Sequence, residues 1–208
     1  MHCDPCLMLI YRSFKGNKKA KKVFFALAKE DFPTHDTVIQ ETGLTLHHVR
    51  DALNFLRGAG LVWGDSCHGL SESGHRLLEL LRDTDQPEPS KALCDDCLLE
   101  IGDLLPADGY SVLAHLSSRR VRSRHDLLIG TELTVARLRD ALVTLEGARL
   151  IQSARGRSFR LSQTGRRLER LLRRRQRASQ WDSIGSIRDP DVGEPLPLSA
   201  ATRGRRRL

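Results

Sequence analysis

The chain has 208 residues, of which 39% are hydrophobic and only 5% aromatic, and its net charge at pH 7 is +8. This length and apolar content suffice for two small cores, and the scarcity of aromatic side chains favours packed helices over a β-sandwich. The longest apolar run near the N-terminus, residues 7–11, falls far short of the ~20 residues of a membrane span and has no signal-peptide pattern. We therefore expect a soluble cytoplasmic protein without a membrane partner.

Each half of the chain opens with a Cys-x-x-Cys pair, Cys3 with Cys6 and Cys94 with Cys97. An odd total of five cysteines fits a reducing compartment better than a secreted disulfide framework. Two such pairs make up the four-thiolate set of a structural zinc site, provided that the two halves meet, around a pseudo-twofold axis. The same ligands suit an iron–sulfur cluster. A third interpretation treats the cysteines as small apolar residues at the start of an amphipathic helix, or as reversible dithiols at a helix N-terminus.

Two short helices are predicted after each cysteine pair and the apolar segment that follows it. Their apolar residues recur at helical spacing, with turn-forming residues between them. The predicted helices are residues 21–30 and 34–43 in the first half and residues 110–118 and 124–132 in the second.

A third helix follows, within a stretch that the chain contains twice. Residues 44–62 read LTLHHVRDALNFLRGAGLV, and residues 133–151 read LTVARLRDALVTLEGARLI. Thr45 and Thr134 suit the N-cap position, the leucines mark one buried face, and a glycine stands where each helix should end. Each stretch therefore predicts one amphipathic helix.

A β-hairpin and a closing helix complete each half. Residues 60–71 and 149–162 are predicted to form two short strands around a polar turn. The closing helices begin in LSESGHRLLELL at residues 70–81 and LSQTGRRLERLL at residues 161–172. We expect a mostly α-helical α+β fold with small β-hairpins.

The repetition predicts a duplicated domain. The matched cysteine pairs and the matched closing helices lie 91 residues apart, and the matched stretches between them lie 89 residues apart. Repeat 1 spans residues 1–82 and repeat 2 residues 93–175. Residues 83–92 form a polar, proline-containing linker, and residues 176–208 are expected to be a disordered basic tail.

The order of helix, short helix, turn, capped helix, hairpin and closing helix resembles the winged helix-turn-helix domain of transcriptional regulators. The resemblance covers roughly residues 20–82 and 108–172 and rests on the stretches quoted above. It implies two tandem winged-helix units in one chain, which would imitate the usual dimer on two DNA half-sites.

The resemblance also implies that the third helix of each unit enters the major groove. Asn54 would pair with adenine there, and arginines would address guanine or phosphate. Asp51 and Asp140 would repel phosphates, so we expect them to be intrahelical or interdomain partners. The candidate DNA-binding residues, including those of the second hairpin, are Thr45, His47, His48, Arg50, Asn54, Thr134, Arg137, Arg139, Arg155, Arg157 and Arg160.

Positive charge gathers in the second half of the chain. Residues 1–92 contain 12 basic and 12 acidic side chains, so they carry no net charge. Residues 93–172 contain 13 basic and 10 acidic side chains, and residues 173–208 contain 9 basic and 4 acidic ones. A basic surface indicates nucleic acid or an anionic membrane, although a solvated arginine surface explains the same excess. The first hairpin lacks fixed positive charge, and its Cys67-His68 pair is either a further metal or redox point or an incidental neighbour pair.

No catalytic motif stands out, since the chain lacks a Gly-rich phosphate loop, a nucleophile elbow and a His-Glu-x-x-His pattern. The sequence predicts a non-enzymatic regulator that binds double-stranded DNA at the nucleoid, as a monomer or a homodimer. Three alternatives stay open: a tandem winged-helix subunit that binds a chromosome-organising or polymerase assembly, a redox- or iron-sensing regulator, and a replication initiator of the tandem winged-helix kind.

Overall fold

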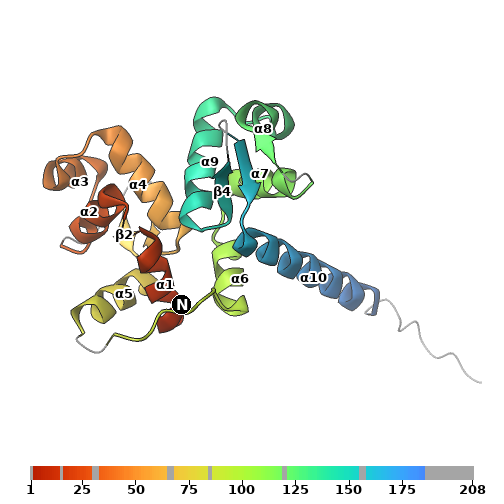
Figure 1. The fold of residues 1–208 in the computed structure, drawn as a ribbon, viewed down its shortest axis with the longest axis horizontal. Helices are drawn as coiled ribbons and strands as arrows, with labels where there is room; N and C mark the ends of the chain where they lie inside the picture. Colours follow the sequence, from red (N-terminus) through yellow and green to blue (C-terminus); the bar gives the residue numbers. More distant parts are fainter. Residues whose placement is uncertain are drawn as a thin grey trace, which may run out of the picture. The chain divides into compact units, whose positions relative to one another are not determined.

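A computed structural model describes residues 2–14, 16–29, 33–64, 68–83, 86–118, 121–154 and 158–185. The chain divides into two compact units, residues 1–173 and residues 174–208. Both cysteine pairs and both hairpins belong to the first unit, which the following paragraphs describe (Figure 1).

Among its described residues, repeat 1 has five helices and a two-stranded antiparallel sheet in which Val62 pairs with Leu70. Its elements are α1 (Asp4–Phe14), α2 (Lys18–Leu27), α3 (His35–Thr42), α4 (Leu46–Gly58), β1 (Val62–Trp63), β2 (Gly69–Leu70) and α5 (Glu72–Arg82).

Repeat 2 has the same order of helices and a three-stranded antiparallel sheet in which β5 lies between β3 and β4. Its elements are α6 (Asp95–Asp103), α7 (Ala107–Ser117), β3 (Arg122–Ser123), α8 (Arg124–Thr131), α9 (Val135–Gly147), β4 (Ile151–Ala154), β5 (Ser158–Leu161) and α10 (Gln163–Gly185).

The expectation of a mostly helical α+β fold with small antiparallel sheets is confirmed. Three details differ from the sequence prediction. The apolar segments after the cysteine pairs are helices, α1 and α6, and β3 is an additional short strand. The tail expected from residue 176 begins inside a helix, because α10 continues to Gly185, and its remainder lies outside the described residues.

Each hairpin is fastened to its closing helix by the serine and glycine of the repeated Leu-Ser-x-x-Gly motif. The Ser71 hydroxyl donates to the Gly60 carbonyl at 2.6 Å and accepts from the Gly74 N–H at 3.0 Å, and Ser162 makes the corresponding contacts in repeat 2. A Cβ on Gly74 would lie 2.3 Å from the Leu61 carbonyl oxygen. Only glycine therefore lets the helix approach the strand so closely.

The buried side chains of both repeats form one continuous core rather than two separate ones. Its largest fully buried members include Phe14 and Phe24 from repeat 1 and Leu98 and Leu127 from repeat 2. The helices α4 and α9 pack against each other across the boundary between the repeats (Figure 1). The two repeats thus share one hydrophobic core.

Candidate metal centre

The four cysteines of the two pairs come together at one point. Cys3 and Cys94 directly precede α1 and α6, and Cys6 and Cys97 lie in the first turn of those helices. Residues three apart share one helix face, so each pair presents both sulfurs on the same side. All four Sγ atoms lie within 4.8 Å of one another, and all four thiols are free.

The distances between these sulfurs fit a single tetrahedral ion. A Zn–S bond of about 2.3 Å places two sulfurs of a tetrahedron about 3.8 Å apart. The Sγ of Cys3 lies 4.0 Å from that of Cys94 and 3.7 Å from that of Cys97. Among the described residues, this is the one group of three or more histidine, cysteine or acidic side chains with metal-binding geometry. The expectation that the two pairs meet is confirmed.

Backbone hydrogen bonds cross between the repeats at this centre in a reciprocal way. The Cys3 N–H donates to the Cys97 sulfur at 3.3 Å, and the Cys94 N–H donates to the Cys6 sulfur at 3.4 Å. Such N–H···S contacts stabilise negative charge on a thiolate. Each repeat thereby supports a ligand from the other.

The thiols differ in how readily they lose a proton. Burial raises the pKa of Cys6 to about 11 and also raises the pKa of Cys97. Burial opposes the charged form of Cys94 as well, but hydrogen bonds from Cys97 and the other thiols outweigh it and lower the pKa of Cys94. A bound cation would favour the thiolate at all four positions, because a coordinating thiol loses its proton.

Ion pairs next to the cysteines repeat the same symmetry. Arg76 of α5 binds Asp4 through two hydrogen bonds of 2.9 and 2.7 Å, and Arg167 of α10 lies 2.6 Å from Asp95. Each pair holds a cysteine-bearing helix against the closing helix of its own repeat. The Arg76 contact lowers the pKa of Asp4. Neither ion pair was predicted from the sequence, although Arg167 lies 91 residues after Arg76 and Asp95 lies 91 residues after Asp4.

His2 joins the two repeats immediately beside Cys3. Its side chain is buried, its backbone N–H donates to the Ser73 hydroxyl at 3.0 Å, and its Nδ1 lies 3.2 Å from the Glu100 carboxylate of α6. Burial lowers the pKa of His2. No motif in the sequence indicated this contact.

A second reciprocal interface lies between α4 and α9, where Arg50 is 2.7 Å from Asp140 and Arg139 is 2.5 Å from Asp51. The offset of 89 residues relates Arg50 to Arg139 and Asp51 to Asp140. Each repeat therefore contributes the same arginine and the same aspartate, as in a contact across a twofold axis. The expectation that the two aspartates are interdomain partners is confirmed.

Two glycines allow α4 and α9 to approach this closely. A Cβ on Gly58 would lie 1.9 Å from the Thr144 carbonyl oxygen, and a Cβ on Gly147 would lie 2.0 Å from the Phe55 carbonyl oxygen. These two contacts are again related by the offset of 89. Sequence analysis treated both glycines only as helix ends, yet their main effect is to bring two backbones together.

The α4–α9 contact occupies side chains that the sequence assigned to DNA. His47 and Arg50 bind α9, and Arg139 binds α4. Asn54 is only 8% exposed, and its amide oxygen accepts a hydrogen bond from Arg57 at 3.3 Å. The expectation that Asn54 faces outward to pair with adenine does not agree with this placement, because the second repeat covers that side of α4.

The remaining residues predicted to contact DNA do not form one continuous surface among the described residues. Thr45 lies 3.1 Å from the His48 ring, and Thr134 caps α9 by accepting from the Arg137 N–H. Arg137 itself binds Asp108 through two hydrogen bonds. Arg160 is exposed on β5, and Arg155 and Arg157 lie outside the described residues.

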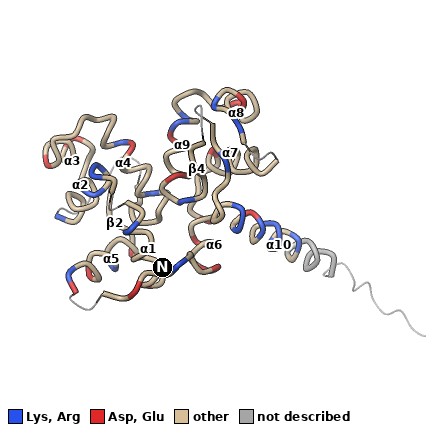
Figure 2. The backbone as a smooth tube through the Cα atoms, viewed as in Figure 1, with Lys and Arg blue, Asp and Glu red and all other residues tan. Residues whose placement is uncertain are grey.

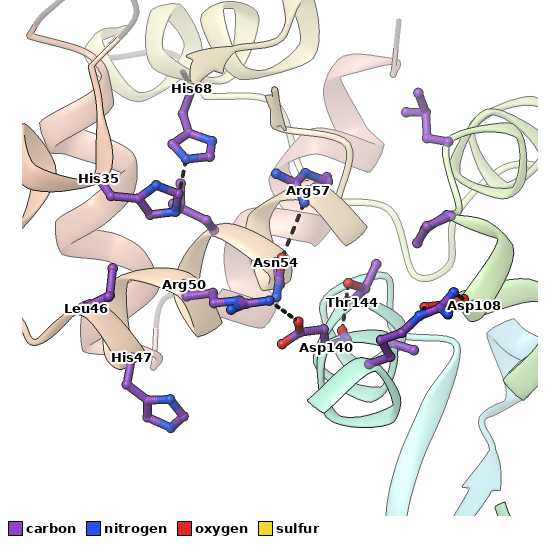
Figure 3. A pocket seen from close by; sticks show the side chains of 15 residues that line it. His35, Leu46, His47, Arg50, Asn54, Arg57, His68, Asp108, Asp140 and Thr144 are labelled. Atoms are coloured by element: carbon purple, nitrogen blue, oxygen red, sulfur yellow. Dashed lines mark hydrogen bonds and ion pairs between the residues drawn. The ribbon is translucent and has the colours of Figure 1, made fainter. Parts of the chain in front are cut away.

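A groove of about 640 Å³ lies beside the helix contact (Figure 3). It is lined by residues from both repeats, among them Arg50 and Asn54 of α4 and Asp140 and Thr144 of α9. His35 and His68 lie on one side of it with their rings facing each other. This volume is typical of small-ligand sites.

The first half of α10 carries a row of arginines (Figure 2). Arg166, Arg170 and Arg173 are exposed and recur at steps of three and four residues, which places them along one helix face. Arg166 also donates to the Leu161 carbonyl, and Arg173 lies 2.6 Å from Glu169. The same helix continues with Arg174 and Arg177.

In the described part of the chain, no helix combines the length and the apolar character that a membrane crossing requires. The chain matches no known family model, no curated protein and no solved structure with which it was compared. Its function has to be inferred from the geometry of its own residues.

Proposed function

We propose that this chain binds double-stranded DNA as a tandem winged-helix protein whose two repeats are clamped together by one zinc ion. The observation that carries the zinc clamp is the convergence of four cysteines, two from each repeat, within 4.8 Å of one another. A structural zinc site is closed by four protein ligands and contributes directly to folding.

Zinc fits the centre better than an iron–sulfur cluster does. In a four-iron cluster each thiolate binds a different iron atom, so the sulfurs must stand farther apart than they do around one ion. The 3.7 Å and 4.0 Å distances between sulfurs are those of ligands on a single tetrahedral ion. The form of the redox- or iron-sensing alternative that requires a four-iron cluster therefore does not fit these distances, whereas a single iron ion would have the same ligand geometry as zinc.

Two features support DNA as the partner. The order of elements in each repeat resembles that of a winged helix-turn-helix domain, and repeat 2 adds a third short strand to its hairpin. The exposed arginines of α10 provide a row of charges at a spacing suited to successive phosphates along a nucleic-acid strand. Phosphate contacts of this kind give affinity that falls steeply with salt.

The proposal places these contacts on α10 and on the hairpin of repeat 2 rather than in the paired helices. Arg50 and Arg139 neutralise aspartates of the opposite repeat, so neither is free to read bases in this arrangement. Arg166, Arg170 and Arg160 are exposed outside the α4–α9 contact. Binding through them would depend on phosphates and groove shape more than on base sequence.

The test measures binding to a duplex of mixed sequence over a range of salt concentrations. Replacing Arg166 and Arg170 together by Gln should weaken binding and flatten the plot of log affinity against log salt by about 0.9 per lost phosphate contact. The matched control, Arg12→Gln with Lys91→Gln, removes the same charge from exposed positions elsewhere. Equal losses in both variants would contradict a specific role for α10.

A protein-interaction subunit remains a second candidate because apolar side chains are exposed at equivalent places. Leu46 and Val135 are the first residues of α4 and α9, and they are 56% and 59% exposed. Apolar residues at the same position of both repeats suit a protein partner. If the chain fails to bind duplex DNA at low salt, this candidate replaces the first.

A further inference from the structure

Two histidines of repeat 1 face each other at the edge of the groove between the repeats. The Nε2 atoms of His35 and His68 are 3.3 Å apart, and their rings are nearly perpendicular, with centroids 4.5 Å apart. Figure 3 shows the two rings meeting beside α4. His68 is only 1% exposed, while His35 is half-buried.

We infer that His35 and His68 form a second metal-binding site for a divalent ion that prefers imidazole, such as Zn²⁺. A Zn–N bond of 2.0–2.1 Å places two nitrogens of a tetrahedron about 3.3–3.4 Å apart. The observed separation of 3.3 Å has this value, and it joins the two atoms through which neutral histidines commonly bind metals. The inference does not depend on the four cysteines or on DNA binding.

The backbone holds the two rings in place before any ion arrives. His35 is the first residue of α3, directly after Thr34, whose side chain accepts from the Thr37 N–H. His68 enters the second strand of the hairpin, and its N–H donates to the Pro33 carbonyl at 3.1 Å. The hairpin and the start of α3 are thus tied together next to the rings, which lowers the entropic cost of binding an ion.

The groove supplies room for the rest of a coordination shell. Two imidazoles leave two positions of a tetrahedral ion open, and both rings line the groove of about 640 Å³. Water or a small anion can fill these positions from the groove. This would be an open site, unlike the closed set of four thiolates.

The pair belongs to repeat 1 alone. The corresponding positions of repeat 2 are Arg124 and Phe159, neither of which binds metals. The cysteine centre, in contrast, takes two ligands from each repeat. A metal ion bound by His35 and His68 would therefore be held by repeat 1 only.

Equilibrium dialysis of the full chain against Zn²⁺ tests the inference. We expect wild type to take up two zinc ions per chain, one tightly at the cysteines and one more weakly. His35→Gln should take up one, and the matched control His125→Gln, an exposed histidine at the start of α8, should still take up two. His35 is the primary variant because His68 is buried, so replacing it would also disturb packing.

Cobalt used as the probe separates the two sites by their spectra. A thiolate site gives intense charge-transfer absorption, whereas a histidine site gives weak bands in the visible range alone. After the cysteine centre is filled with zinc, added Co²⁺ should give the weak bands in wild type and in His125→Gln but not in His35→Gln. In Cys94→Ser with Cys97→Ser the thiolate bands should be lost, and the weak bands should persist at temperatures below the lowered melting temperature of this variant.

Two results would overturn the inference. The first is saturation of wild type at the cysteine ion alone, which would make the pair a simple hydrogen bond between two imidazoles. The second is equal uptake by His35→Gln and wild type, which would place the additional ion elsewhere. Failure of the cysteine site alone would leave the weak cobalt bands intact and would count against the proposed zinc clamp instead.

Discussion

The two repeats have matching residues where they contact each other and different residues on their outer surfaces. At the interface, Arg50 and Asp51 of repeat 1 exchange ion pairs with Arg139 and Asp140 of repeat 2, and each cysteine pair supports the other. Away from it, repeat 1 carries the histidine pair, with 11 basic and 9 acidic residues in residues 1–82, whereas repeat 2 carries the arginine row of α10. A twofold contact uses the same residues twice, so both copies must keep them, while outer surfaces are free to diverge.

The largest expected effect comes from breaking the reciprocal cysteine centre. Cys94→Ser with Cys97→Ser should remove the bound metal and lower the melting temperature sharply, because a structural zinc site contributes on the order of 10 kcal/mol. Elemental analysis and thermal unfolding measure both. Cys67→Ser, which removes the fifth thiol, serves as the control. A metal-free wild type with the melting temperature of the double variant would refute the clamp.

The next largest effect should follow from adding a methyl group between α4 and α9. Gly58→Ala and Gly147→Ala should each destabilise the protein by about 1–3 kcal/mol, because the new Cβ meets a backbone carbonyl of the opposite helix. Helix propensity by itself predicts the opposite sign, a gain of about 1 kcal/mol. Urea unfolding decides between the two predictions.

Gly16→Ala is the control for these variants, because a Cβ there meets no atom within 4 Å. Similar losses from Gly58→Ala and Gly147→Ala would support the symmetry of the contact. A gain in stability from either variant would show that the helices are farther apart than the structure places them.

The smallest effect should come from the ion pairs. Arg50→Asp and Asp140→Arg should each cost about 1 kcal/mol or less, because these side chains are partly exposed and solvent weakens their attraction. Combining them should restore most of the loss, since the pair is re-formed with its charges exchanged. A double-mutant cycle in urea measures this coupling. Strictly additive losses would mean that the pair contributes nothing.

Local features of the fold could be predicted from the sequence because they depend on neighbouring residues. Thr134 caps α9 as predicted, and α4 begins directly after Thr45. The helices α1 and α6 were predicted mainly as apolar segments, because the Cys-x-x-Cys pair at the start of each was interpreted chiefly in terms of metal ligands. The cysteine centre itself could be predicted, since its two pairs recur at a fixed offset.

The surroundings of Asn54 could not be predicted in the same way. The spacing of Val49, Leu53 and Leu56 correctly identifies one buried face of α4, although Leu46 at the start of the same series is 56% exposed. This face places Asn54 on the opposite, outward side. In the structure α9 covers that second side, and Asn54 is 8% exposed. Hydrophobic periodicity does not predict the contact between α4 and α9, because polar and charged side chains and two glycines form this contact.

The sequence by itself determined the helices α4 and α9, the cap of α9, the two hairpins and the two cysteine pairs, because each is encoded within a few residues of itself. Only the tertiary structure decided that α4 and α9 pack on each other and that His35 meets His68. These contacts depend on the absence of a side chain at Gly58 and Gly147 and on how two distant segments are oriented. Neither property leaves a periodic signal along the chain.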